Sequence, residues 1–154
     1  MNTAEQPNPP DLFSHITTQI FQLNGLLLAW GDQFCADLNL TSARWQMLGA
    51  LHLAEEPQTS PQLADRMGMT RQGSQKQLNL LLADGLVETI ENPAHKRSSL
   101  YTLTPQGQAV YHKIHQRWHQ QINNWSTGLK MDDLQTTEKI LNHLTVQIKS
   151  NPAD

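Results

Sequence analysis

Polar side chains between residues 71 and 79 have the types and the spacing that a DNA-reading helix requires. If a helix begins after Thr70, positions 71, 72, 75, 76 and 79 share one face, opposite Leu78 and Leu81. Arginine can donate to guanine O6 and N7 or to a phosphate, and glutamine suits the adenine edge. The same face could also be the solvated side of an ordinary surface helix. The candidate DNA-binding residues in this segment are Arg71, Gln72, Ser74, Gln75, Lys76 and Asn79.

A second group of candidate DNA contacts lies at the N-termini of two predicted helices. Thr59 and Ser60 precede a proline, which suits the first turn of a helix, and Thr70 begins the helix predicted over 70–84. Free backbone N–H groups and the helix dipole favour a phosphate at such ends. Each hydroxyl can also be a plain helix cap, and the two roles are compatible. Gly68, between the two helices, suits the left-handed conformation that closes a tight turn.

Two adjacent basic residues, Lys96 and Arg97, occupy a polar loop between two segments of alternating hydrophobicity. The segments 86–90 and 100–103 are expected to pair as strands, with the loop as a basic wing over 91–99. Guanidinium suits a narrow, negative minor groove, so Arg97 is the candidate for insertion there. Two adjacent bases in a loop can also be solvated charge. Helix, tight turn, helix and basic ribbon together predict a winged helix-turn-helix.

The other segments are predicted to be helices that join two subunits. Phe21, Leu26 and Leu28 widen the apolar stripe of the first helix beyond one buried face, and a second subunit explains the excess. The fold class is therefore mainly α with a small β wing. The predicted parts are a disordered tail over 1–10, a dimerisation helix over 11–39, a winged helix-turn-helix DNA-binding domain over 40–103, and C-terminal dimerisation helices over 104–150.

The distribution of charge is more informative than the total of −3. Residues 1–59 carry one basic and six acidic side chains, whereas residues 60–100 carry five basic and four acidic ones. The bases thus lie where the DNA-reading elements are predicted, but the patch is thin, so affinity should depend strongly on dimerisation. The sequence has no apolar run that could span a bilayer and no secretory leader at its start, which predicts a cytoplasmic protein without a membrane partner.

Cysteine and histidine side chains offer two alternatives to a purely DNA-binding protein. Cys35, the single cysteine, could sense oxidants or could be a buried, inert thiol. His112, His115 and His119 share one face of the helix predicted from Pro105, and this face could bind zinc, with Cys35 as a further ligand. Solvated or hydrogen-bonded histidines are the other interpretation, and no metal is predicted.

Tryptophans are the candidates for a small-molecule site. Trp30, Trp45 and Trp118 could line an effector pocket between the DNA-reading and dimerisation helices, together with Trp125. Tryptophans at helical spacing also serve as core or as subunit interface. A ligand of such a pocket would be aromatic or phenolic.

The chain resembles the MarR family of transcription regulators over about residues 12–149. The resemblance rests on LTSARWQMLGAL at 40–51, PQLADRMGMTRQ at 61–72, LLLADGLVETIENP at 80–93 and KRSSLYTLTPQG at 96–107. It implies a triangular homodimer on a pseudo-palindromic operator, with a ligand or oxidant altering the distance between the two recognition helices in many members. Family wings usually carry an acidic residue before the basic pair, where this chain has Ala94 and His95, and Ser74 and Gln77 replace groups that are mostly apolar in the family.

The sequence therefore predicts a homodimeric transcription regulator that binds double-stranded DNA and acts as a repressor. We expect no catalytic residues and no cofactor, because the chain lacks a glycine-rich phosphate loop, a nucleophile elbow and a paired metal signature. Two other functions stay open at this point: a winged-helix module that binds proteins and not DNA, and a zinc-responsive regulator.

Overall fold

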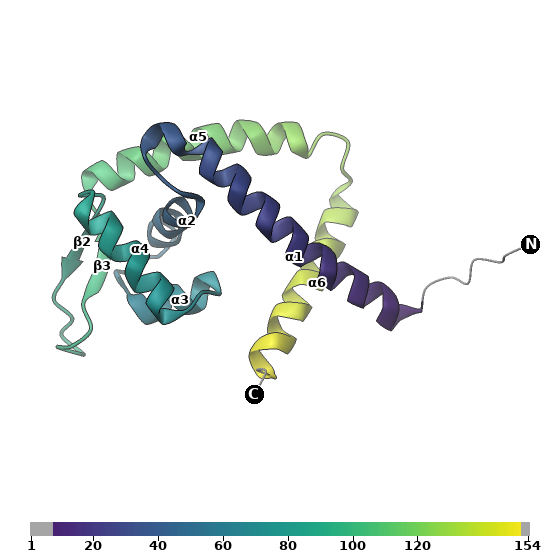
Figure 1. Ribbon diagram of the computed structural model, residues 1–154, viewed down its shortest axis with the longest axis horizontal. Coiled ribbons are helices and arrows are strands. Elements are labelled where there is room, and N and C mark those ends of the chain that lie inside the picture. Colours follow the sequence, from purple (N-terminus) through teal and green to yellow (C-terminus); the bar gives the residue numbers. More distant parts are fainter. Residues whose placement is uncertain (1–7, 152–154) are drawn as a thin grey trace, which may run out of the picture. The chain divides into compact units, whose positions relative to one another are not determined.

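The computed structural model describes residues 8–151 and divides the chain into two compact units (Figure 1). The first unit ends at Ile114 and the second begins at His115, within one helix. The first contains α1 (Pro9–Phe34), a 3-10 helix (Ala36–Leu38), α2 (Ser42–His52), β1 (Gln58–Thr59), α3 (Ser60–Met67), α4 (Arg71–Ala83), β2 (Val87–Ile90), β3 (Leu100–Leu103) and the start of α5 (Pro105–Trp125). The rest of α5 and α6 (Met131–Ser150) make up the second. The predicted fold class, mainly α with a small β wing, is confirmed.

Helix α1 begins earlier than the sequence analysis predicted. The Asn8 side chain accepts a hydrogen bond from the Asp11 backbone N–H at 3.0 Å and caps the helix, and two prolines fill the first turn. Proline suits that turn because its φ is already helical and its missing N–H has no helical partner there. The predicted disordered tail over 1–10 is therefore wrong at its last two residues, since Pro9 and Pro10 are helical. Its first seven residues lie outside the described part of the chain.

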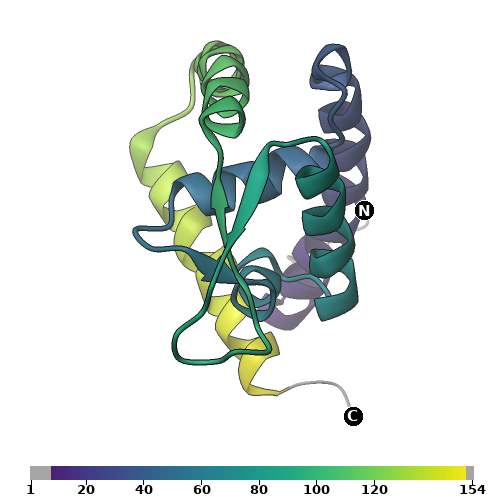
Figure 2. The same cartoon turned by 90° about the vertical axis from the view of Figure 1, so that its left-hand side faces the viewer.

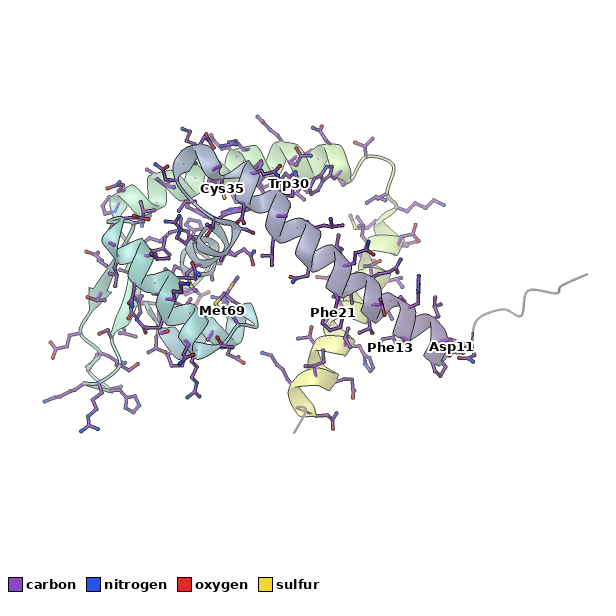
Figure 3. All side chains as sticks on the ribbon, in the orientation of Figure 1. Asp11, Phe13, Phe21, Trp30, Cys35 and Met69 are labelled. Atoms are coloured by element: carbon purple, nitrogen blue, oxygen red, sulfur yellow. The ribbon has the colours of Figure 1, made fainter. Side chains whose placement is uncertain are left out.

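Local capping rules place α3 and α4 where the sequence predicted them. Thr59 forms a capping box with Gln62, Gly68 ends α3 in the left-handed conformation with φ of 62°, and Thr70 accepts from the Gly73 N–H at 3.0 Å. Met69 lies in the turn between the two helices (Figure 3). These caps require no distant partner, which is why the sequence alone reveals them.

The sheet has the order β1–β3–β2, with both pairings antiparallel. Tyr101, in the central strand, lies opposite Gln58 of β1 and Thr89 of β2. The β2–β3 ribbon and the wing loop that joins its strands are seen most clearly in Figure 2. The sequence analysis missed β1, because two residues are too few to show an alternating pattern.

The core of the first unit lies between α2, α3, α4, the sheet and the start of α5. Its fully buried aliphatic side chains are Met47, Leu48, Leu63, Leu78, Leu81 and Ile114. Tyr111 of α5 is also buried, and this burial raises the pKa of its phenol. Among residues 8–151, no helix combines the length and hydrophobicity that a bilayer crossing requires.

Both α1 and α6 leave apolar side chains uncovered. Phe21 and Leu26 of α1 are 77% and 61% exposed, and α6 contains no buried residue at all. On α6, Leu134, Leu141 and Ile148 lie seven residues apart on one face and are 41%, 43% and 60% exposed. Each helix therefore carries apolar side chains that residues 8–151 leave exposed.

The start of α5 packs directly against the residue that precedes β2. A Cβ atom on Gly107 would lie 1.9 Å from the Leu86 carbonyl oxygen, a distance that no side chain tolerates. The same junction is tied by Thr104, whose backbone N–H donates to the Leu86 oxygen at 3.1 Å and whose hydroxyl donates to the Gly85 oxygen at 2.7 Å. This close contact between the start of α5 and Leu86 fixes the position at which the β2–β3 ribbon leaves the core.

Replacing Gly107 by alanine should destabilise the fold by about 3 kcal/mol, because the backbone must move to admit the methyl group. Urea denaturation measures the change. Gly49→Ala in α2 is the matched control: its Cβ would meet only a Tyr111 ring carbon at 3.6 Å, so better helix propensity should dominate and the change should stay within about 1 kcal/mol. Equal denaturation midpoints for the two variants would contradict the close approach.

Candidate nucleic-acid interface

The polar face predicted for α4 is the face that the structure exposes. Arg71, Gln72, Lys76 and Asn79 are all exposed, while Leu78 and Leu81 on the opposite side are completely buried. The helix is held at its C-terminal end by Arg44 of α2. One Arg44 Nη donates to the Asp84 carboxylate at 2.6 Å and the other to the Asn39 carbonyl at 2.7 Å. The sequence analysis missed this clamp, since the partners are 40 residues apart.

Ser74 and Ser60 do not present their side chains to DNA, contrary to the sequence prediction. Ser74 is completely buried and Ser60 is 7% exposed. The Ser74 hydroxyl donates to the Ser60 carbonyl at 2.9 Å and accepts from the Ser60 hydroxyl at 3.2 Å. Ser74 lies on the side of α4 that packs on α3, where an unpaired hydroxyl would be costly, and the two serines satisfy each other. A polar contact thus takes the place of the apolar group usual in the family.

Gln75 is only partly exposed, and its amide is already engaged within the protein. Its Nε2 donates to the Tyr101 hydroxyl at 3.0 Å and to the Asn79 Oδ1 at 2.9 Å. Bidentate recognition of adenine needs an N–H from this same amide. Gln75 as the structure holds it is therefore not poised to read adenine, which corrects the role suggested by its position on the helix.

Thr59 and Thr70 both act as helix caps. Thr59 is half-buried and exchanges hydrogen bonds with Gln62, whereas Thr70 is exposed at the start of α4. Because Thr70 is exposed, its hydroxyl can cap the helix and still reach a phosphate, as the sequence suggested. Its contact with DNA stays a prediction.

The wing is organised by Asn92, a residue that the sequence analysis did not single out. Asn92 is 7% exposed. Its Oδ1 accepts from the backbone N–H groups of Ala94 and His95 at 3.1 and 3.3 Å, and its Nδ2 donates to the Ser98 carbonyl at 2.8 Å. The Asn–Pro pair at 92–93 was the available signal, because asparagine before proline favours such turns. In a wing that lacks the usual acidic residue, this one amide makes three hydrogen bonds to the loop, beside the backbone bonds from His95 to Asn92 and from Ser98 to His95.

Lys96 and Arg97 extend from this ordered loop and are exposed. Arg97 also lines a hollow of about 290 Å³ together with Arg71 of α4. The other lining residues come from the start of α3, from α4, from the wing and from β3: Ser60, Pro61, Gln75, Ser98, Ser99 and Tyr101. Two arginines from different elements and the first residues of a helix therefore line one concave surface, an arrangement that favours anionic groups.

Cys35 is completely buried at the end of α1, near Trp30 (Figure 3). Its Sγ donates to the Gly31 carbonyl at 2.8 Å and approaches the Leu40 carbonyl at 3.5 Å. These contacts agree with the interpretation of Cys35 as a buried thiol.

The histidines of α5 make ring contacts with other histidines. The His112 ring packs edge-on against His52, and the ring centroids of His115 and His119 are 4.8 Å apart. Within residues 8–151, no three His, Cys, Asp or Glu side chains come together to hold a metal ion. The histidine face, with or without Cys35, thus provides no assembled zinc site in the described chain.

The tryptophans proposed for an effector pocket make packing contacts. The Trp30 ring stacks on Phe34 at 4.5 Å between centroids, and Phe34 lies 5.3 Å from Trp45, which joins α1 to α2. Trp118 contacts Trp125 at 6.0 Å within the second unit. The effector pocket itself stays a prediction.

Comparisons with known proteins agree with this geometry. Residues 38–98 match the model of the MarR family. The uncharacterized protein Rv2011c of Mycobacterium tuberculosis is 34% identical over 140 residues, which cover 91% of this chain and 96% of that protein. A crystal structure of a MarR family transcription regulator is similar with a TM-score of 0.71, 27% identity and coverage of 90% and 96% of the two chains. A mutant of MarR from E. coli, solved in complex with operator DNA, is 25% identical with a TM-score of 0.72 and coverage of 87% and 98%.

Replacing Asn92 by alanine should loosen the wing while the helical core stays folded. The change removes three hydrogen bonds of the loop, and amide hydrogen exchange at Ala94 and His95 should accelerate at least tenfold. Asn92→Asp is the matched variant, because it keeps the acceptor of both N–H groups and loses only the donor to Ser98. It should give an intermediate acceleration. Unchanged exchange in Asn92→Ala would show that the loop is ordered by other contacts.

Proposed function

Since the chain belongs to the MarR family of transcription regulators, we propose that it is a repressor that binds a pseudo-palindromic operator as a homodimer. In this proposal α4 lies in the major groove and the wing contacts the adjoining minor groove or its phosphates. The bases are read mainly by Arg71 and Gln72, flanked by Lys76 and Asn79. Lys96 and Arg97 make the wing contacts.

The observation that supports this proposal best is the convergence of Arg71 and Arg97 on one hollow. The two side chains come from α4 and from the wing, and both line the same concave surface. Contacts between basic side chains and phosphates supply most of the sequence-independent affinity of a protein for DNA. The clustering also explains how a chain with a net charge of −3 can present a locally cationic face.

The homodimer is supported by the uncovered apolar faces of α1 and α6. Monomeric soluble proteins rarely expose contiguous apolar patches larger than a few hundred Å². Exposed apolar side chains seven residues apart share a face of each helix: Phe21 and Leu28 on α1, and Leu134, Leu141 and Ile148 on α6. A second copy that covers these helices would place two recognition helices at about 34 Å, one turn of B-form DNA, on the two halves of an operator.

Control by a small aromatic or phenolic effector completes the proposal. A ligand held near Trp30, Trp45 or Trp118 would favour one of two distances between the recognition helices, and only one of them matches the operator. A cytoplasmic location accords with this role.

Removing the two convergent arginines should abolish most operator binding. The double variant Arg71→Ala, Arg97→Ala should bind DNA selected from a random pool about 100-fold more weakly, with a shallower dependence on salt. The double variant Lys113→Ala, Lys130→Ala is the control: it removes two exposed positive charges that lie outside α1, α4, α6 and the wing, and it should bind as wild type does.

Two results of this binding experiment would contradict the proposal. Unchanged binding by the arginine double variant would show that the contacts are assigned wrongly. A wild-type protein that selects no DNA at all, even at low salt, would favour a winged-helix module that binds proteins.

A charge on α1 should separate the two subunits. Phe21→Glu places a carboxylate in the proposed interface, so light scattering should report a mass of 17.4 kDa in place of twice that value. Leu53→Glu is the matched control, because Leu53 is 69% exposed at the end of α2, outside α1 and α6, and its variant should remain dimeric. A wild-type protein that is monomeric at high concentration would overturn the proposed assembly.

A further inference from the structure

We propose that Gln75 is a positioning residue that couples the recognition helix to the wing through Tyr101, and that it does not read a base. The inference rests on the proposed function and deepens it. It divides the polar face of α4 into residues that contact DNA and one residue that sets the geometry of the interface.

The contact joins two elements that are distant in sequence. The Gln75 Nε2 donates to the Tyr101 hydroxyl at 3.0 Å, across 26 residues of chain. Tyr101 is 7% exposed and lies in the central strand β3, two residues after the wing loop ends. Because β3 is paired on both sides, its tyrosine is a rigid anchor for the base of the wing.

The neighbouring residue, about 100° further round the helix, ties α4 to a different element. Ser74 donates to the Ser60 carbonyl, which fixes α4 to the start of α3. Two consecutive side chains of α4 therefore link it to α3 and to the strand at the base of the wing. Loss of the Gln75 contact should free only the wing side and leave the packing of α3 on α4 intact.

The side-chain amide of Gln75 is already hydrogen-bonded within the protein, and this distinguishes Gln75 from the exposed Gln72. Both of its N–H groups are used, since Nε2 donates to the Asn79 Oδ1 at 2.9 Å as well as to Tyr101. Reading adenine would require breaking one of these bonds. Gln72 is exposed one residue past Arg71 and suits base contact without such a loss.

The coupling has a functional consequence for operator binding. Arg71 and Arg97 line the same hollow as Gln75 and Tyr101, so the contact borders the surface that both arginines share. With the wing held at a fixed distance from α4, contacts in the major groove and at the wing form together. Without this restraint, ordering the wing on DNA costs entropy that weakens binding to every sequence alike.

A double-mutant cycle tests the coupling. Gln75→Ala removes the amide and Tyr101→Phe removes only the hydroxyl, so each should weaken operator binding by about five- to tenfold, the effect of one ordinary hydrogen bond. Because both remove the same contact, the double variant should bind no more weakly than the weaker single variant. The loss should be equal for operators substituted at each half-site position.

Gln72→Ala is the matched control on the same helix. The loss of affinity in this variant relative to wild type should disappear when the base pair that Gln72 reads is replaced, because a base contact is specific to one position. If instead Gln75→Ala relaxes the preference at one base pair while Tyr101→Phe does not, Gln75 reads a base and the proposal is overturned. Additive losses in the double variant would overturn it as well.

A measurement without DNA separates this inference from the proposed function. Amide hydrogen exchange over residues 94–98 of the free protein should accelerate in both Gln75→Ala and Tyr101→Phe, and should be unchanged in Gln72→Ala. Unchanged exchange in the first two variants would overturn the coupling, even if the protein binds its operator. Accelerated exchange in a protein that selects no DNA would support the coupling and overturn the regulatory function.

Discussion

Burial of Leu78 and Leu81 determines what every other side chain of α4 can do. Both are completely buried against the core of the first unit, and removing them from water is the dominant favourable term for this helix. Once these two positions face inward, helical geometry assigns the rest. Ser74 is carried into the contact with α3, Gln75 reaches Tyr101 in the central strand of the sheet, and Arg71 and Gln72 remain outside. The face that we propose binds DNA is thus the complement of the buried one.

Elements fixed by short-range chemistry could be predicted from the sequence, whereas those fixed by distant partners could not. The caps at Thr59 and Thr70 and the left-handed turn at Gly68 follow from a few neighbouring residues, and all three are present. The two-residue strand β1 exists only because β3 is there to pair with it. The early start of α1 is hard to predict, because the three prolines among the first ten residues suit a disordered tail as well as the first turn of a helix.

The candidate interface shows the same division at the level of single side chains. The exposure of Arg71, Gln72 and Lys76 follows from helical periodicity alone. The roles of Ser74 and Gln75 depend on partners 14 and 26 residues away, which no periodicity reveals. Polar residues on a helix look alike in sequence. Their burial and their hydrogen-bond partners decide whether they bind a ligand or hold the structure together.

The burial of Cys35 makes the folded chain suited to site-directed labelling. Thiol reagents attack an accessible thiolate, and the Cys35 sulfur is shielded from solvent and hydrogen-bonded to the Gly31 carbonyl. A cysteine introduced at an exposed position would therefore react selectively, with no need to remove the native one. Spectroscopic probes attached in this way could report the separation of two protomers in solution.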